Sequence, residues 1–290
     1  MERQVTSMGA GMRIGLVGID SSHAEDFLRH FNTEQRHSDI RVTALWGDEA
    51  RSSELVANAS GLETASSLDA LIAGVDAVIV GDRHGALHAQ HALPCLAAGK
   101  PVFVDKPLAC AVADATAIVD AAERAVVPLL SGSALRWQTA TTVLKARLAY
   151  ADGPLSIDGY GTWYPDSEYG GPIFYAIHTI ELLQELTGTK WSGLRVESGD
   201  EPIIRYESGR ATVSISFRPL GASGSSAFGV SVRSPVLTCE TPIPLPSDYM
   251  APVTDRIATM LQTGQSSMDR EALLAPVQMM AEINALLARR

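Results

Sequence analysis

The strongest constraint on the fold of this chain is an alternation near its start, in which short apolar runs are followed by longer segments rich in Ala, Leu and Glu. Five such runs occur, at residues 13–17, 41–45, 76–80, 102–104 and 128–130. Apolar strands separated by helix-length segments are typical of parallel sheets that are covered on both faces. The first part of the chain is therefore predicted to form a doubly wound α/β domain.

The second part of the chain mixes helical stretches with strand-like runs that Gly and Ser separate. Strands are expected at residues 155–163, 194–197, 203–206, 211–217, 228–232 and 236–239, and helices at 139–150, 173–186, 253–261 and 270–287. This pattern predicts an α+β domain on a mostly antiparallel sheet. The expected organisation is a flexible tail (1–11), a Rossmann-type dinucleotide-binding domain (12–134) and a domain for substrate binding and dimerisation (135–290).

Charge and cysteine content exclude several classes of protein. The 23 Lys and Arg against 33 Asp and Glu give a formal charge of −10, which excludes binding to nucleic acid through phosphate contacts. Three widely spaced cysteines without a CxxC pair predict a reduced, cytoplasmic setting. No apolar stretch has the length of a membrane span or the form of a signal peptide, so no membrane association is expected.

The turn after the first apolar run has the position of a dinucleotide-binding loop but only part of its glycine pattern. Gly18 stands where the tight turn needs glycine, whereas Asp20 and His23 replace the second and third glycines. The candidate cofactor contacts in this turn are Gly18, Asp20, Ser21, Ser22 and His23. A turn without a ligand is the alternative, in which Ser22 and Glu25 form a capping box for the next helix.

An acidic residue follows the second run, where the ribose hydroxyls of NAD are commonly bound. Asp48 holds this position, although capping of the next helix explains it equally well. No Lys or Arg lies nearer than Arg51, so a 2′-phosphate has no obvious partner. The sequence therefore slightly favours NAD over NADP as the cofactor.

An acidic residue, a lysine and a proline directly follow the run at 102–104, at the sheet edge where open α/β proteins bind ligands. This segment, with Asp105 and Lys106, resembles the Glu-Lys-Pro signature of the glucose-fructose oxidoreductase, inositol dehydrogenase and rhizopine catabolism (Gfo/Idh/MocA) family, with Asp in place of Glu. The order of elements is similar to that family from residue 12 onward. The resemblance implies that Lys106 acts on the reacting hydroxyl and that Asp105 orients Lys106.

The same resemblance implies further contacts around the nicotinamide and the substrate. Asp82, His84 and His88, which follow the third run, are expected on the cofactor side together with Lys106. Arg136, which follows the last strand of the first domain, is expected at the substrate.

The second signature of that family is a Gly-Gly turn, then an Asp and, four residues later, a His. Gly170 and Gly171 form the turn and His178 is kept, but Phe174 stands in place of the Asp. His178 is a candidate general base or substrate hydrogen-bond partner. Because Phe174 offers an apolar wall, the substrate is expected to be less polyhydroxylated than a sugar, or to present a ring for stacking.

Aromatic residues gather in the sequence around this turn, namely Tyr160, Trp163, Tyr164, Tyr169 and Tyr175. Trp163, Tyr164 and Tyr175 are candidate substrate contacts together with Phe174. Packing in the core of the sheet, or a contact between subunits, explains them equally well.

A helical spacing of three histidines raises the alternative of a metal site. His84, His88 and His91 could share one helix face, with Asp82 and His23 near them in the predicted topology. The family resemblance explains His84 and His88 without a metal, so no metal ligands are predicted.

These observations leave three functional hypotheses. The first is an NAD(P)-dependent oxidoreductase that transfers a hydride to or from a hydroxyl, carbonyl or imine carbon of a small, sugar-like or cyclic metabolite. The second is a cofactor-independent or metal-assisted lyase, isomerase or cyclase that uses the same Lys106 and His178. The third is a non-catalytic binding subunit. The open sheet of the second domain predicts a homodimer or higher homo-oligomer.

Overall fold

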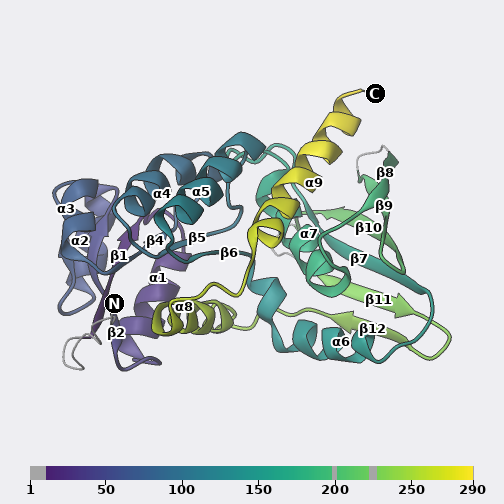
Figure 1. The fold of residues 1–290 in the computed structure, drawn as a ribbon, viewed down its shortest axis with the longest axis horizontal. Helices are drawn as coiled ribbons and strands as arrows, with labels where there is room; N and C mark the ends of the chain where they lie inside the picture. The colour runs from purple at the N-terminus through teal and green to yellow at the C-terminus, as the bar shows by residue number, and fades with distance from the viewer. Residues whose placement is uncertain (1–10, 198–200, 222–226, 290) are drawn as a thin grey trace.

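The computed structural model of the protein describes residues 11–197, 201–221 and 227–289, and two sheets lie at its opposite ends (Figure 1). The first sheet has the strand order β3-β2-β1-β4-β5-β6, with parallel pairing throughout. Its strands are β1 (Met12–Val17), β2 (Ile40–Trp46), β3 (Glu63–Thr64), β4 (Ala77–Val80), β5 (Val102–Val104) and β6 (Leu129–Ser131). The predicted doubly wound domain is confirmed, and the full burial of β4 and β5 explains their unbroken apolar sequences.

Helices cover both faces of this sheet (Figure 1). They are α1 (His23–Leu28), α2 (Glu49–Ala57), α3 (Leu68–Gly74), α4 (His88–Ala97) and α5 (Val112–Ala125). Side chains of α1 and α2 share a core with β1 and β2, whereas those of α3, α4 and α5 pack into a second core with β4 and β5. Helix α1 is short and continues into a π-helical turn, Arg29–Thr33.

Three neighbouring strands of the first sheet end at the same level. Val17 at the end of β1 pairs with Val80 of β4, and Val80 pairs with Val104 of β5. The turns that follow these strands therefore leave the sheet side by side. This register brings together sequence motifs that are separated by more than 80 residues.

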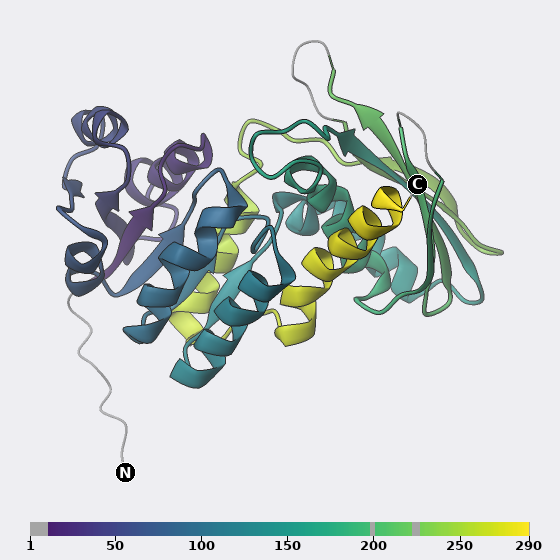
Figure 2. The ribbon, with the colours of Figure 1, turned by 90° about the horizontal axis from the view of Figure 1, so that it is seen from above.

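The second sheet has the strand order β12-β11-β7-β10-β9-β8 (Figure 1), and Figure 2 shows this sheet at the end of the molecule that lies opposite the first sheet. Its strands are β7 (Leu155–Trp163), β8 (Ser192–Glu197), β9 (Ile203–Ser208), β10 (Ala211–Pro219), β11 (Gly229–Arg233) and β12 (Thr238–Pro242). The β7–β10 pair is parallel and the other pairs are antiparallel, which confirms a mostly antiparallel sheet. The strand expected at 236–239 begins two residues later, because Ser234 donates its backbone N–H to the Leu237 carbonyl and closes a hairpin turn there.

The helices of the second half are α6 (Thr139–Ala149), α7 (Ile173–Thr187), α8 (Ala251–Thr263) and α9 (Arg270–Ala288). Helix α7 packs on the inner face of the second sheet, where Gly161 of β7 leaves room for Thr179. Helix α8 instead returns to the first domain and buries Val253 and Ile257 in the core of β1 and β2. Part of the segment assigned to the second domain thus packs with the first.

The described helices include none that is long and apolar enough to cross a membrane. The predicted flexible tail, residues 1–11, lies outside the described residues except for Gly11.

Candidate active site

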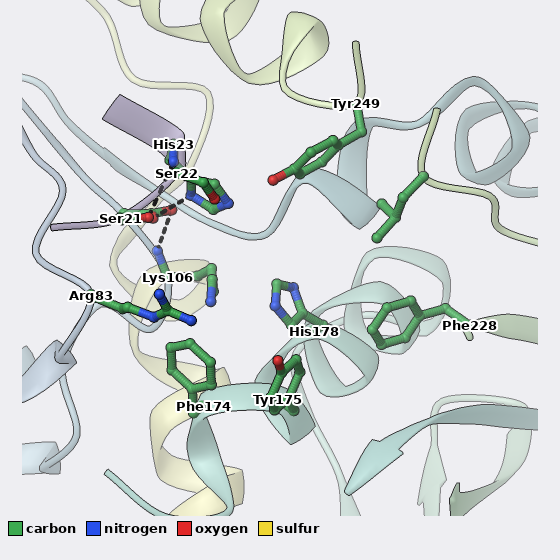
Figure 3. Close-up of a pocket in the computed structure, with 12 residues that line it drawn as sticks. Ser21, Ser22, His23, Arg83, Lys106, Phe174, Tyr175, His178, Phe228 and Tyr249 are labelled. Atoms are coloured by element: carbon green, nitrogen blue, oxygen red, sulfur yellow. Dashed lines mark hydrogen bonds and ion pairs between the residues drawn. The ribbon is translucent and has the colours of Figure 1, made fainter. Parts of the chain in front are cut away.

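A cavity of about 190 Å³ lies between the strand ends of the first sheet and the start of helix α7 (Figure 3). Its lining consists of Ser21, Ser22, His23, Arg83, Asp105, Lys106, Phe174, Tyr175, His178, Phe228, Leu245 and Tyr249. Lys106 and His178, which come from signatures 70 residues apart, thus line one cavity with the turn after β1. Asp105 is the only carboxylate among these lining residues.

Asp105 forms a buried pair with His23. Its Oδ2 lies 2.6 Å from Nδ1 of His23, and its Oδ1 accepts the backbone N–H of Lys106 at 2.8 Å. Burial alone would raise the pKa of this carboxyl, but the positive charges of His23 and Lys106 and the two hydrogen bonds outweigh burial and hold the pKa below its usual range. Asp105 is therefore ionised, and each of its oxygens has one hydrogen-bond partner.

Lys106 points its ammonium group into the cavity. Its side chain is buried, and Nζ lies 4.3 Å from the ring centroid of Phe174. Burial lowers the pKa of Lys106, and the positive charge of Arg83 lowers it further, whereas Asp105 and Glu181 oppose the shift. A lysine with a lowered pKa exchanges its proton more easily near neutral pH than an exposed lysine does.

His178 faces Lys106 from the first turns of α7 (Figure 3). Its Nδ1 lies 2.7 Å from Oγ of Ser133, so Nε2 is the nitrogen left for a ligand. Burial and the positive charges of Lys106 and His23 place the pKa of His178 well below the usual value, and Asp105 opposes this shift. The imidazole is therefore neutral at neutral pH and able to accept a proton.

The turn after β1 is built around Gly18, whose φ of +71° lies in the left-handed region. A Cβ at this position would collide with Asp82, so glycine is required here for packing as well as for conformation. The side chain of Asp20 contacts the neighbouring turn after β4, where its Oδ1 accepts the backbone N–H of Arg83 at 3.0 Å. The replaced glycine position thus connects the turns after β1 and β4.

The capping box expected from Ser22 and Glu25 is absent. Ser22 has helical backbone angles and makes no capping hydrogen bond, and Ser21 Oγ accepts the His23 N–H instead, at 3.2 Å. Glu25 accepts a hydrogen bond from Arg51 at 2.5 Å. The capping prediction was wrong because Ser22 already has helical backbone angles and the Glu25 carboxylate pairs with Arg51.

Asp48 and the histidines predicted on the cofactor side have structural contacts. Asp48 caps α2 by accepting the Arg51 N–H at 2.9 Å. The ring nitrogens of His88 lie 2.7 Å from the Pro107 carbonyl and 2.9 Å from the Asp82 carbonyl, which ties the turns after β4 and β5 together. The side chains of Asp48, His84 and His88 do not line the cavity.

The histidine spacing in this region does not form a metal site. His84 accepts the Ala86 N–H, and His91 pairs with Asp82 Oδ2 at 2.8 Å. Within the part of the chain that the structure describes, no group of three His, Cys, Asp or Glu side chains is placed to hold a metal ion.

Arg136 does not line the cavity either, contrary to its predicted role at the substrate. It is buried, and its Nε donates to Glu181 at 2.7 Å and its Nη1 to Glu185 at 3.1 Å. Glu181 also accepts the N–H of Ser133 at 2.6 Å. These contacts fix the end of β6 to α7 and thereby hold Ser133, the partner of His178, in place.

The predicted aromatic contacts separate into three groups. Phe174 and Tyr175 line the cavity, with their rings edge to face at 4.9 Å. Tyr164 is 41% exposed and lies beside Tyr175 at 6.3 Å. Trp163 is buried against Phe217 in the core of the second domain, because it points to the inner face of β7.

Several cavity residues were not anticipated from the sequence, namely Arg83, Phe228, Leu245 and Tyr249. Arg83 follows the end of β4, at the same sheet edge as Lys106, so its position in the sequence could have predicted it as a cavity residue. The other three precede β11 or lie between β12 and α8, where no local pattern marks them.

Comparison with known proteins agrees with this geometry. Residues 12–133 match the model of the Gfo/Idh/MocA family, described as an oxidoreductase family with an NAD-binding Rossmann fold. This part of the chain is thus similar to the Gfo/Idh/MocA family. The resemblance seen in the Asp105-Lys106-Pro107 segment is thereby confirmed.

An inositol 2-dehydrogenase of Acidiphilium cryptum is 40% identical to this chain over 121 residues, which are 38% of this chain and 33% of the relative. Two inositol 2-dehydrogenases of Saccharopolyspora erythraea are 36% and 37% identical and are covered over 37% and 32% of their length. The chain thus matches about a third of the length of these relatives.

Solved structures share the fold over nearly the whole chain. A probable dehydrogenase of Thermotoga maritima has a TM-score of 0.80 at 16% identity, over 96% of this chain and 98% of its own. GenD2 from gentamicin A biosynthesis, solved in complex with NAD, has a TM-score of 0.79 at 16% identity, over 100% of this chain and 98% of its own. Because the sequence identity is only 16%, this structural similarity establishes the fold alone.

Proposed function

We propose that this protein is a nicotinamide-dependent dehydrogenase or reductase of a small metabolite with a hydroxyl, carbonyl or imine group at the reacting carbon. The observation that carries the proposal is that Lys106 and His178 line one cavity together with the turn after β1. The family match of residues 12–133 supports the same class of reaction.

The turn after β1 has donors that fit a dinucleotide. In the described ranges, the backbone N–H groups of Asp20, Ser21 and Ser22 donate no hydrogen bond, and Ser21 and Ser22 line the cavity. The side chains that replaced glycines are held elsewhere, Asp20 on the Arg83 amide and His23 on Asp105. These free amides would bind the pyrophosphate of the coenzyme.

We propose NAD rather than NADP as the preferred coenzyme. Arg51 is the nearest cation for a 2′-phosphate, and it is already paired with Glu25 at 2.5 Å and with Glu54 at 2.7 Å. Among the residues that the structure describes, only Oδ1 of the Asp48 carboxylate accepts a hydrogen bond, so Oδ2 would accept hydrogen bonds from ribose hydroxyls.

The protein groups would handle the substrate oxygen and its proton. A bound nicotinamide would supply or accept the hydride. Lys106 would polarise the substrate oxygen, because a buried cation stabilises negative charge that develops there. His178, neutral at neutral pH, would accept the hydroxyl proton in oxidation and return it in reduction. Asp105 and His23 would position Lys106 by fixing the backbone on which it stands.

The relatives do not support the alternative of a lyase, isomerase or cyclase, since they include inositol 2-dehydrogenases and a biliverdin reductase. They do not support inositol as the substrate either. The family model matches residues 12–133, whereas the substrate side carries Phe174 where the family signature has an Asp.

A ligand screen by thermal unfolding tests the proposed function. Because a ligand that binds only the folded state raises its stability, NAD or NADH should raise the Tm in a concentration-dependent manner, and NADP should do so less. Magnesium and zinc ions serve as a test of metal-assisted chemistry. Stabilisation by a metal ion and by no dinucleotide would contradict the proposal.

We also propose a homodimer that forms through the outer face of the second sheet. This face carries polar pairs, such as Asp158 with Arg233 at 2.8 Å and Arg218 stacked over Tyr160 at 4.2 Å. Light scattering coupled to size-exclusion chromatography should give about twice the chain mass of 30.8 kDa. A mass of one chain would contradict the dimer.

The cysteines support the proposed cytoplasmic location. Cys95, Cys110 and Cys239 are free thiols. Burial raises the pKa of Cys95 to about 12 and that of Cys110 to about 11, so both thiols stay protonated and unreactive at neutral pH. Fractionation of the host cell should recover the protein with reduced thiols, and recovery of an oxidised, exported form would contradict this location.

A further inference from the structure

Arg83 extends from the first domain across the cavity towards the second. Its guanidinium carbon lies 4.5 Å from the ring centroid of Tyr169 and 5.9 Å from that of Phe174, and both rings belong to the second domain. Figure 3 shows the guanidinium beside Lys106 and Phe174. Among the residues that the structure describes, no carboxylate lies within ion-pair distance of this group.

The ammonium group of Lys106 also contacts the Phe174 ring, with Nζ 4.3 Å from the ring centroid. The nearest acid, Asp105, is occupied by His23 and by the Lys106 amide. Lys106 is buried and Arg83 is exposed, and contacts with the aromatic faces compensate only part of the repulsion between these two like charges. An anionic ligand between Arg83 and Lys106 would remove this repulsion and gain charge-assisted hydrogen bonds.

The rest of the cavity is small and largely apolar. Its remaining walls include Tyr175, Phe228, Leu245 and Tyr249, and its volume is about 190 Å³. A polyol would need several hydrogen-bond acceptors for its hydroxyl protons, and Asp105, the single carboxylate of the lining, already binds His23 and the Lys106 amide. The lining therefore suits a small ligand with one anionic group and an apolar remainder.

We propose that the cavity binds a small 2-hydroxy or 2-oxo monocarboxylate with an apolar side chain, and that Arg83 binds its carboxylate. This inference rests on the proposed dehydrogenase function and names its substrate class. The planar, two-pronged guanidinium matches a carboxylate in geometry. The adjacent hydroxyl or oxo group would then lie at Lys106 and His178, and the side chain among Phe228, Leu245 and Tyr249.

The reaction balances with the groups already described. In oxidation, the C–H bond at carbon 2 breaks and its electron pair leaves with the hydrogen as a hydride, which reduces NAD to NADH. The hydroxyl O–H bond breaks, its proton passes to His178, and the C=O bond forms. Reduction of the 2-oxo acid is the reverse.

A phosphate of the coenzyme is the other anion that Arg83 could bind. The contacts of Arg83 favour the substrate, because its guanidinium stacks on Tyr169 and Phe174 of the second domain. The free amides that suit a pyrophosphate lie instead in the turn after β1. The experiment below separates the two anions.

Calorimetric titration of the NADH-saturated protein with 3-phenyllactate and with its neutral amide, 3-phenyllactamide, tests the proposal without turnover. The acid should bind about tenfold or more tightly than the amide, as expected for a charge-assisted hydrogen bond. Arg83→Gln should abolish this preference and leave the affinity for NADH unchanged. Arg124→Gln is the matched control, because Arg124 is exposed in the last turn of α5 and does not line the cavity, and it should behave as wild type.

Equal binding of the acid and the amide by the wild-type protein, or binding of neither, would overturn the proposal. A loss of NADH affinity in Arg83→Gln as large as its loss of acid affinity would also overturn it, since Arg83 would then bind the coenzyme. A protein that binds the acid but no dinucleotide would retain the carboxylate site and would overturn the proposed dehydrogenase function instead.

Discussion

Nδ1 of His23 lies 2.6 Å from Oδ2 of Asp105, so a residue of the turn after β1 holds the carboxylate that directly precedes Lys106. In a dinucleotide-binding loop the position of His23 is usually a glycine that permits close helix packing. Here the side chain at that position links two strand ends and forms part of the cavity wall. The side chain that replaces the third glycine thus binds the carboxylate next to Lys106.

His23→Gln should destabilise the protein, because it removes the partner of a buried, ionised carboxylate. The expected loss is about 2 to 4 kcal/mol of unfolding free energy, measured by urea denaturation. His37→Gln is the matched control, since His37 pairs with Asp255 at 3.0 Å but this carboxylate is 48% exposed. The control should lose less than about 1 kcal/mol. Equal losses in both variants would contradict a buried His23–Asp105 pair.

Lys106→Met should reduce turnover by about 10²- to 10⁴-fold, because it removes the group that polarises the substrate oxygen. Its Tm should stay close to the wild-type value or rise, since a buried ammonium without a carboxylate partner is replaced by an apolar side chain of similar length. Lys190→Met, at an 87% exposed side chain, provides the control for the loss of a lysine charge. Near-normal turnover of Lys106→Met would contradict a role of Lys106 in the reaction.

Stability should fall as the pH drops through about 6.5, the ordinary pKa of histidine, because His178 resists protonation in the folded state. Below that pH the unfolded chain binds a proton that the folded protein does not bind, until the lowered folded pKa is reached. This difference costs about 1.4 kcal/mol per pH unit for one group. His178→Gln should reduce the slope of unfolding free energy against pH by that amount. A wild-type slope in His178→Gln would contradict a neutral, buried His178.

Phe174→Asp should raise the pKa of Lys106, because it places a carboxylate where the ring now contacts Nζ at 4.3 Å. The pH profile of kcat/KM should then shift upward by about one unit or more for the limb that Lys106 controls. Phe174→Leu keeps the wall apolar and should leave that limb in place. The same shift in both variants would show that Phe174 acts through packing and not through charge.

The sequence predicted the first sheet well, because strands buried on both faces are encoded as unbroken apolar runs such as Ala77–Val80. It also identified Lys106 and His178, since each stands in a local signature at a strand end or a helix start. Their shared cavity depends on the register of Val17, Val80 and Val104, which no local pattern encodes.

Arg136 shows why the remaining site residues were harder to predict. A charged residue after a strand can turn to a ligand or to another element, and the choice here is made by Glu181, 45 residues away in the sequence. Arg83 and Tyr249 reach the cavity from segments far apart in the chain. Contacts of this kind leave no periodicity in the sequence, so they become visible only in the folded protein.

The most direct test of the account is the dissociation constant for NAD of the wild-type protein, Ser22→Asp and Ser22→Asn, measured by calorimetry. Ser22 lies on the cavity wall in the turn proposed to bind the pyrophosphate, and Asp and Asn differ in charge but hardly in shape. We predict that Ser22→Asn binds NAD nearly as the wild type does and that Ser22→Asp binds it about tenfold or more weakly, because a carboxylate repels the pyrophosphate. Equal affinities of the Asp and Asn variants, or no binding of NAD to the wild-type protein, would contradict the account.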